Sequence, residues 1–319
     1  MTGSITRATP KHVPRRLFVD ANRPTVPGMK CLSFGDVTVD RLVEAQGLSF
    51  HPNYLLPDSS SEALAGESEW LEPHFFDPGS GRFIMSLHTY VIRTPHHVIL
   101  VDTCVGNDKD RPSTKPWDKL NTPYLANLGA MGVNTEEVDY VLCTHLHVDH
   151  VGWNTKLENG RWVPTFPNAR YLFHQFEYDH WENAGRWGAG KGSSDGCFED
   201  SVLPVMEAGQ ADLVAGDYAI DDSLWLEPSP GHSPGHVCLN LEGGGRKAVF
   251  TGDVFHHPCQ CAYPEWSSRF CFDPGQSSLT REHYIDRLGD TDTLVLAAHF
   301  ASPVTGRIVS NGARCRFQV

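Results

Sequence analysis

Four side chains that bind metal ions fall within six residues of the sequence, in His145-Leu-His147-Val-Asp149-His150. They directly follow residues 138–144, whose short apolar run predicts a buried strand. Side chains two residues apart on an extended chain point the same way, so His145 and His147 can hold one ion. Once the chain turns, Asp149 and His150 face a neighbouring position. Imidazole and carboxylate groups in this arrangement indicate a site for a divalent cation.

Further motifs flank this segment in a definite order along the chain. They are Val101-Asp102-Thr103, followed by Cys104, then Pro230-Gly-His232-Ser-Pro-Gly-His236, Phe250-Thr-Gly-Asp253 and Ala298-His299. Together with the histidine-rich segment they resemble the signature motifs of the metallo-β-lactamase superfamily. The resemblance covers roughly residues 85–300. One departure is Cys104, which stands where the family usually has glycine.

The resemblance implies two metal ions and assigns ligands to each. The first ion would be held by His145, His147 and His232, and the second by Asp149, His150 and His299, with Asp253 bridging the two. His236 and Asp102 would not bind metal themselves but would orient the ligands and their turns. For Asp102 a simple turn-forming role is the alternative.

Neutral imidazoles combined with carboxylates favour zinc, two ions per chain, with manganese, cobalt or iron as substitutes. The iron-dependent flavo-diiron branch of the family has Glu where this chain has His147, and classical β-lactamases often have Cys where it has Asp253. Both departures favour a dizinc hydrolase. Two metals about 3.5–4 Å apart can share a water and lower its pKa towards 7, which gives a hydroxide able to attack the substrate. Asp149 is predicted to pass a proton to the leaving group.

Substrate choice is expected to come from loops over the metal site. His256 stands three residues after Asp253, where lactonases of the superfamily that act on acyl-homoserine lactones tend to have Tyr. We predict that His256 donates a hydrogen bond to the developing oxyanion, with a packing or supporting role as the alternative. Arg269 either meets an anionic substrate or is an ordinary surface residue. Aromatic residues around the signature are expected to pack in the core or to line an apolar pocket: Trp153, Trp162, Phe166, Phe173, Trp181 and Trp187.

The predicted function is a zinc-dependent hydrolase in which a hydroxide bridging two zinc ions cleaves an ester or lactone of a small apolar or aromatic substrate. A phosphotriester is the nearest neighbouring substrate class. One alternative is a hydrolytic dehalogenase of chlorinated aromatics that uses the same site. Another is an oxidoreductase resembling persulfide dioxygenases with a single iron, which the second set of ligands argues against. A non-catalytic binding protein would be expected to have lost some ligands.

The elements that must position these residues predict an α/β protein, and the resemblance implies the αββα four-layer sandwich of the metallo-β-lactamase type. Residues 1–35 are expected to form an N-terminal arm and residues 36–319 the catalytic domain. Strands are expected at residues 36–43, 87–94, 98–102, 138–144, 169–173, 224–227, 237–241, 248–251 and 294–298. Helices are expected at residues 61–71, 116–129, 175–183 and 280–288, the last capped by Thr280. Residues 51–82, apart from the short helix at 61–71, and the glycine-rich residues 185–197 read as loops.

The composition limits the kinds of binding partner that we expect. The formal net charge of −13 argues against nucleic acid as a binding partner. No apolar stretch reaches the length of about 20 residues that a membrane helix needs. The nine cysteines are scattered and odd in number, which favours reduced thiols and a cytoplasmic protein. Cys259, Cys261 and Cys271 cluster, but their spacing is not that of a zinc ribbon. A small-molecule substrate is expected, and a homodimer is plausible.

Overall fold

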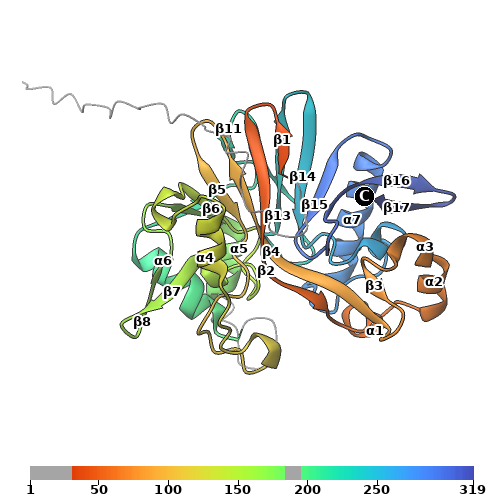
Figure 1. The fold of residues 1–319 in the computed structure, drawn as a ribbon, viewed down its shortest axis with the longest axis horizontal. Coiled ribbons are helices and arrows are strands. Elements are labelled where there is room, and N and C mark those ends of the chain that lie inside the picture. The colour runs from red at the N-terminus through yellow and green to blue at the C-terminus, as the bar shows by residue number, and fades with distance from the viewer. Residues whose placement is uncertain (1–30, 184–194) are drawn as a thin grey trace, which may run out of the picture.

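Two β-sheets face each other in the middle of the computed structural model, which describes residues 31–183 and 195–319 (Figure 1). The first sheet has the order β1 (Leu32–Phe34), β2 (Val37–Leu48), β4 (Arg82–Arg93), β5 (Val98–Val101), β6 (Tyr140–Leu142), β9 (Arg170–His174) and β10 (Ala211–Val214), and β3 (Phe76–Asp77) pairs with β4. The second has the order β11 (Ala219–Asp221), β12 (Leu224–Pro228), β13 (Val237–Gly243), β14 (Arg246–Gly252), β15 (Leu294–Ala297), β16 (Thr305–Asn311) and β17 (Arg314–Gln318). A separate hairpin joins β7 (Thr155–Glu158) to β8 (Arg161–Pro164).

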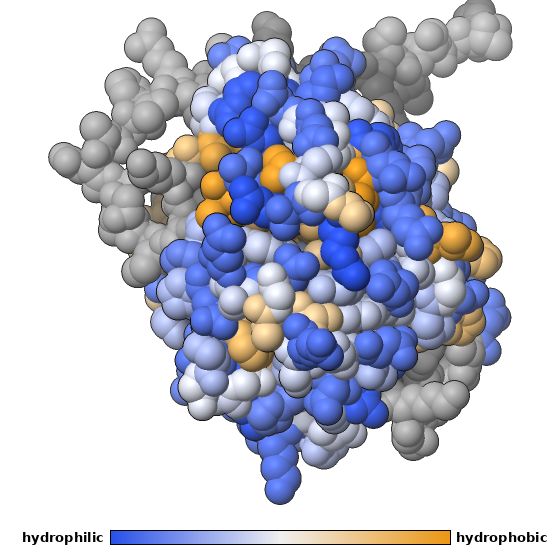
Figure 2. Space-filling model, turned by 90° about the vertical axis from the view of Figure 1, so that its right-hand side faces the viewer, coloured by the Kyte–Doolittle hydropathy of each residue, from blue (hydrophilic) through white to orange (hydrophobic). Residues whose placement is uncertain are grey.

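Helices cover the outer faces of both sheets. On one side lie α4 (Tyr124–Ala130), α5 (Gln175–Asn183) and α6 (Leu203–Glu207), and on the other lies α7 (Pro274–Leu288) (Figure 1). Three short helices, α1 (Pro52–Leu55), α2 (Ser61–Gly66) and α3 (Ser68–Leu71), lie at one end. The face that carries these helices and the β16–β17 hairpin is mostly hydrophilic, with a band of hydrophobic side chains in its upper half (Figure 2). The predicted four-layer α/β sandwich is confirmed.

Alternation along the strands explains the layers. On β5, Ile99 and Val101 point into the core shared by the two sheets, whereas Leu100 points into the core beneath the helices. On β6 the same holds for Leu142 and Val141 respectively. Because both faces of these strands are buried, their sequences are continuously apolar, as is typical of strands in the interior of an α/β sheet.

Several predicted boundaries were wrong. Helix α7 begins at Pro274, because Asp273 caps it by accepting the Gln276 N–H at 2.9 Å and proline fits the first helical turn. Thr280 instead donates its hydroxyl to the carbonyl of Pro230 at 2.6 Å. The helix expected at 61–71 is divided into α2 and α3, and that expected at 116–129 is reduced to α4 with a 3₁₀ turn at Lys115–Trp117.

The N-terminal arm and one loop fall partly outside the described residues. Residues 32–34 of the predicted arm form β1, which pairs with β2, and residues 1–30 are not described. Residues 184–194, which contain most of the expected glycine-rich loop, are not described either. Within the described ranges, no helix is long and apolar enough to cross a membrane.

The topology brings four chain segments to one edge of the sandwich. Strands β5 and β6 are parallel, and so are β14 and β15, so the carboxyl ends of each pair meet. Asp102 follows β5, Asp253 follows β14 and His299 comes two residues after β15. The loop that carries the histidine-rich segment follows β6. These strand ends form the floor of the candidate site.

Candidate metal centre

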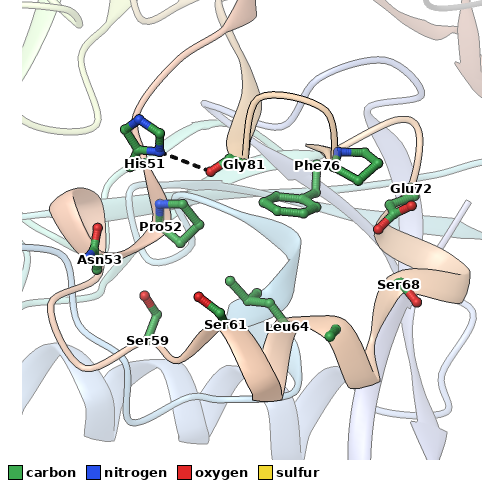
Figure 3. Close-up of a pocket in the computed structure, with 12 residues that line it drawn as sticks. His51, Pro52, Asn53, Ser59, Ser61, Leu64, Ser68, Glu72, Phe76 and Gly81 are labelled. Carbon is green, nitrogen blue, oxygen red and sulfur yellow. Dashed lines mark hydrogen bonds between the residues drawn. The ribbon is translucent and has the colours of Figure 1, made fainter.

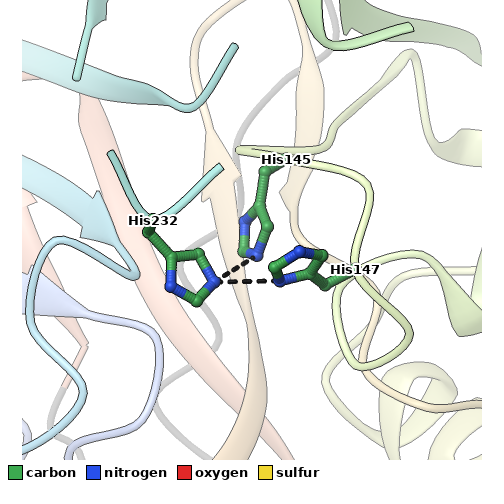
Figure 4. Close-up of side chains that lie close together, drawn as sticks. All are labelled: His145, His147 and His232. Atoms are coloured by element: carbon green, nitrogen blue, oxygen red, sulfur yellow. Dashed lines mark hydrogen bonds between the residues drawn. The ribbon is translucent and has the colours of Figure 1, made fainter. Parts of the chain in front are cut away.

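Three histidine nitrogens converge at the first predicted position, which we call the first triad: His145, His147 and His232 (Figure 4). The Nε2 atom of His232 lies 2.9 Å from His147 Nδ1 and 3.1 Å from His145 Nε2. All three side chains are buried. Nitrogens bound to one tetrahedral zinc at about 2.0–2.1 Å would lie about 3.3 Å apart, so the observed spacing fits a single ion.

Asp149, His150 and His299 form the second triad. The two carboxylate oxygens of Asp149 lie 3.7 Å from His150 Nε2 and 3.5 Å from His299 Nε2. Both imidazoles are buried, whereas the side chain of Asp149 is 14% exposed. Asp149 is therefore the member of this triad that faces the open side of the site.

Asp253 lies between the two triads. Its Oδ1 atom is 3.1 Å from His299 Nε2 and 3.4 Å from His150 Nε2. Its Oδ2 atom is 3.2 Å from His232 Nε2 and 3.9 Å from His145 Nε2. Each oxygen thus faces one triad, which is the arrangement that a carboxylate shared by two ions requires.

The electrostatics of the cluster suit divalent cations. Burial lowers the pKa of His145 and His232 well below the usual value and that of His147 to about 4, so these imidazoles are neutral and keep a lone pair for a metal. Burial acts to raise the pKa of Asp253, but the charges of His299 and His150, whose own pKa values are raised, outweigh it and hold the pKa well below its usual range.

Two buried atoms of the cluster also lack a hydrogen-bond partner, namely His150 Nε2 and Asp253 Oδ1. Unpaired buried groups of this kind are costly unless an ion coordinates them. The donor set, its burial and its unpaired atoms therefore fit a pair of divalent metal ions.

Asp102 holds the His150 side chain of the second triad in position. Its carboxylate accepts a hydrogen bond from His150 Nδ1 at 2.9 Å and from the Thr144 backbone N–H at 2.8 Å. The opposite ring nitrogen of His150 is thereby left for the ion. The turn is tight, since Asp102 and Cys104 have φ angles of 57° and 53°. This left-handed conformation explains why glycine is usual at position 104.

His236 faces the backbone of a ligand. Its Nε2 accepts the Asp253 N–H at 3.0 Å, and its Nδ1 lies 2.7 Å from the Ser229 hydroxyl. Its imidazole therefore orients the strand end that presents the Asp253 carboxylate.

The three cysteines that lie close together in the sequence do not form a group with metal-binding geometry. Cys259 and Cys261 are buried in the larger of the two hydrophobic cores, and Cys271 Sγ lies 3.6 Å from His232 Nδ1. Across the described ranges, no group with metal-binding geometry includes a cysteine. The thiol of Cys271 instead supports the outer nitrogen of a first-triad histidine.

His256 lies directly beside the two triads. Its Nε2 is 3.3 Å from Asp253 Oδ2, and its ring centroid is 4.6 Å from that of His232. Its Nδ1 is buried without a hydrogen-bond partner, whereas its Nε2 faces the Asp253 carboxylate. Arg281, which the sequence analysis did not single out, is fully buried and donates to the carbonyls of Val254 at 3.0 Å and Pro264 at 2.5 Å. It fixes both ends of the loop that carries His256.

Among the aromatic residues expected near the site, Trp181 contacts a ligand, with its ring 5.3 Å from that of His147. The others that are described pack elsewhere: Trp153 stacks on Tyr124, Trp162 lies under the Lys109 ammonium, and Phe166 and Phe173 belong to the core beneath the helices. Trp187 lies outside the described residues. Arg269 is exposed and stacks over the ring of Tyr54.

A cavity of about 510 Å³ lies in the segment 51–81 (Figure 3). Ser59, Ser61 and Glu72 line it together with Leu64 and Phe76. None of the seven predicted ligands lines this cavity, so it is separate from the metal centre.

The chain belongs to the metallo-beta-lactamase superfamily, whose family model matches residues 86–299. Among curated relatives, an N-acyl homoserine lactonase of Bacillus cereus is 26% identical over 164 residues, which are 48% of this chain and 57% of the relative. The N-acyl homoserine lactonase AttM of Azorhizobium caulinodans is 32% identical over 114 residues, which are 35% of this chain and 39% of the relative. The matches thus span about half or less of the relatives' length.

Solved structures resemble the fold over nearly the whole chain. The hydrolase AbOPH superposes with a TM-score of 0.74 and 23% identity, covering 92% of this chain and 98% of its own. AidC, a dizinc quorum-quenching lactonase in complex with a product, superposes with a TM-score of 0.72 and 18% identity, covering 91% and 97%. At this level of identity the likeness shows the fold alone.

The first prediction concerns the close packing of backbone around Gly152, beneath the candidate metal centre. Gly152 lies so near the turn after Asp102 that an added Cβ would stand 1.9 Å from the carbonyl of Val105. Gly152→Ala is expected to lower the free energy of unfolding by about 3 kcal/mol, because backbone must shift to admit the methyl group. Urea-induced unfolding measures the effect. Gly129→Ala in α4 is the control, since nothing lies within 4 Å of that Cβ; a loss of stability equal in both variants would contradict the argument.

Proposed function

We propose that the protein is a dizinc hydrolase that opens a lactone or ester bond of a small apolar or aromatic substrate. The observation that carries the proposal is the position of Asp253, with one carboxylate oxygen towards each triad. The first triad would hold one zinc ion, the second triad the other, and Asp253 would bridge them. Manganese, cobalt or iron could occupy the same ligands.

When bound, the two cations supply Lewis acidity, which yields a hydroxide nucleophile near neutral pH and polarises the substrate's carbonyl oxygen. The protein residues then have separate tasks. Asp149, on the open side of the site, is placed to take up a proton and return it to the leaving alkoxide. His256, whose Nε2 faces the two triads at 3.3 Å from Asp253 Oδ2, would donate to the oxygen on which negative charge develops.

The relatives support the lactone among the possible substrates. Both curated relatives described above are N-acyl homoserine lactonases, and AidC is a dizinc lactonase. The complete second triad favours two ions over the single iron of a persulfide-dioxygenase-like enzyme. His256, in place of the Tyr usual in acyl-homoserine lactonases, leaves the identity of the lactone open to test.

The test is a substrate panel run on zinc-loaded protein. It includes acyl-homoserine lactones of different chain lengths, an aliphatic γ-lactone, an aryl ester, a phosphotriester and a chlorinated aromatic. Ring opening is followed by the release of acid and by mass spectrometry of the product, which gains one water. We expect the lactones to be turned over fastest. Turnover of the phosphotriester or chlorinated aromatic alone would reject the lactonase assignment.

The second prediction concerns His256. His256→Ala is expected to lower kcat by about 10²-fold, the cost of removing one donor to a developing oxyanion, with zinc content unchanged. Steady-state kinetics and elemental analysis measure the two quantities. His283→Ala on the exposed face of α7 is the control. An unchanged kcat together with reduced stability would show that His256 only packs.

A further inference from the structure

Glu177, on α5, is a buried carboxylate surrounded by four hydrogen-bond donors. It accepts the backbone N–H of Leu146 at 3.1 Å and of Gly235 at 2.7 Å, the hydroxyl of Ser233 at 2.8 Å, and the indole N–H of Trp181. All of these partners donate, so an ionised carboxylate, which only accepts, satisfies them together.

Three of the four donors come from the segments that carry the first triad, and the fourth, Trp181, lies on α5 with Glu177. Leu146 stands between two of its histidines, and Ser233 directly follows the third. The ring of Trp181 packs on His147. The α5 helix also approaches so closely that a Cβ on Gly235 would lie 2.3 Å from the Glu177 nitrogen. Glu177 therefore joins the two loops of the first triad.

Glu44, on β2, has a matching set of donors on the other side of the centre. It accepts the backbone N–H of Val105 at 2.9 Å and of Gly106 at 3.3 Å, the hydroxyl of Thr122 at 3.3 Å, and the indole N–H of Trp153 at 2.6 Å. Each carboxylate thus receives two backbone N–H groups, one hydroxyl and one indole.

Three of the four partners of Glu44 belong to segments that adjoin the second triad, and the fourth, Thr122, precedes α4. Val105 and Gly106 end the tight turn that begins at Asp102, the residue that holds His150. Trp153 comes three residues after His150, and its backbone N–H donates to Thr103 in the same turn at 2.8 Å. Glu44 therefore joins the turn and the loop that orient the second triad.

We propose that Glu177 and Glu44 are positioning residues that divide the support of the dinuclear centre: Glu177 sets the metal affinity of the first triad, and Glu44 that of the second. The inference rests on the proposed two-metal function. A glutamine at either position would turn an NH₂ group towards donors that need an acceptor, so the loops would separate. Loss of such outer support typically weakens metal binding about 10- to 100-fold.

The experiment isolates each site before testing its support. In a His299→Ala background, which disables the second triad, zinc affinity is measured by chelator competition with and without Glu177→Gln or Glu44→Gln. We expect Glu177→Gln to weaken binding about 10- to 100-fold and Glu44→Gln to change it less than about threefold. In a His232→Ala background the order should reverse. The absorption spectrum of bound cobalt, which reports the ligand set, provides a second readout.

Ser233→Ala and Thr122→Val are milder variants, because each removes one hydroxyl donor to one of the two carboxylates. They test the same inference where a glutamine variant fails to fold. Equal weakening of both sites by either carboxylate variant would mean a general structural role and would overturn the inference. Unchanged zinc affinity in both carboxylate variants would also overturn the inference. Fewer than two zinc ions in the unaltered protein would overturn the proposed function as well, which distinguishes the two failures.

Discussion

Removal of metal ions by a chelator is expected to lower lactone hydrolysis by at least about 10³-fold, because no side chain around the site can lower the pKa of water to about 7 as two cations do. Zinc, manganese or cobalt should restore turnover. Magnesium should not, since the first triad consists entirely of imidazoles and magnesium prefers oxygen ligands.

The measurement is the rate of ring opening before and after dialysis against chelator, with metal content determined in the same samples. A protein carried through dialysis without chelator is the control for loss by handling. Thermal unfolding of the metal-free sample shows whether the fold persists. Full activity in a sample shown to contain no metal would reject the proposed chemistry.

The histidine-rich segment could be recognised from sequence as a candidate metal-binding segment because the evidence for it is local. The residue types of His145, His147, Asp149 and His150 indicate metal binding, and their spacing after an apolar strand indicates which side chains point the same way. The convergence of this segment with Asp253 and His299 is not local. It follows from two pairs of parallel strands whose carboxyl ends meet at one edge. The sequence indicates this strand arrangement only through the family resemblance.

Supporting residues could not be predicted in the same way. Glu177 lies in a short helix where an acidic residue looks like any surface position, and only its close approach to the turn at Gly235 makes it a buried acceptor. Arg281 has the same character, since its position in α7 gives no sign that three neutral oxygens surround the guanidinium. The β16–β17 hairpin was missed because few of its side chains are buried, among them Ile308 and Phe317, so its apolar alternation is weak.

The strongest single-residue effect is expected at Asp253. Asp253→Asn should lower kcat/KM by about 10³-fold, equivalent to about 4 kcal/mol of transition-state stabilisation. The carboxylate is buried, and four triad imidazoles lie within 3.9 Å of its two oxygens. An amide of the same shape keeps one acceptor but brings an NH₂ group towards one triad and removes the negative charge that two neighbouring cations share. We therefore expect tight binding of one zinc ion and weak binding of the other.

Kinetics and zinc stoichiometry on the same preparation separate this explanation from simple unfolding. Asp222→Asn, at an exposed acidic residue of the β11–β12 turn, is the matched control and should leave both quantities unchanged. If Asp253→Asn retained two tightly bound ions and normal turnover, the carboxylate would not bridge them. Because Asp253 is, among residues 31–183 and 195–319, the side chain with an oxygen towards each triad, that result would leave two independent sites and remove the physical basis for a shared nucleophile.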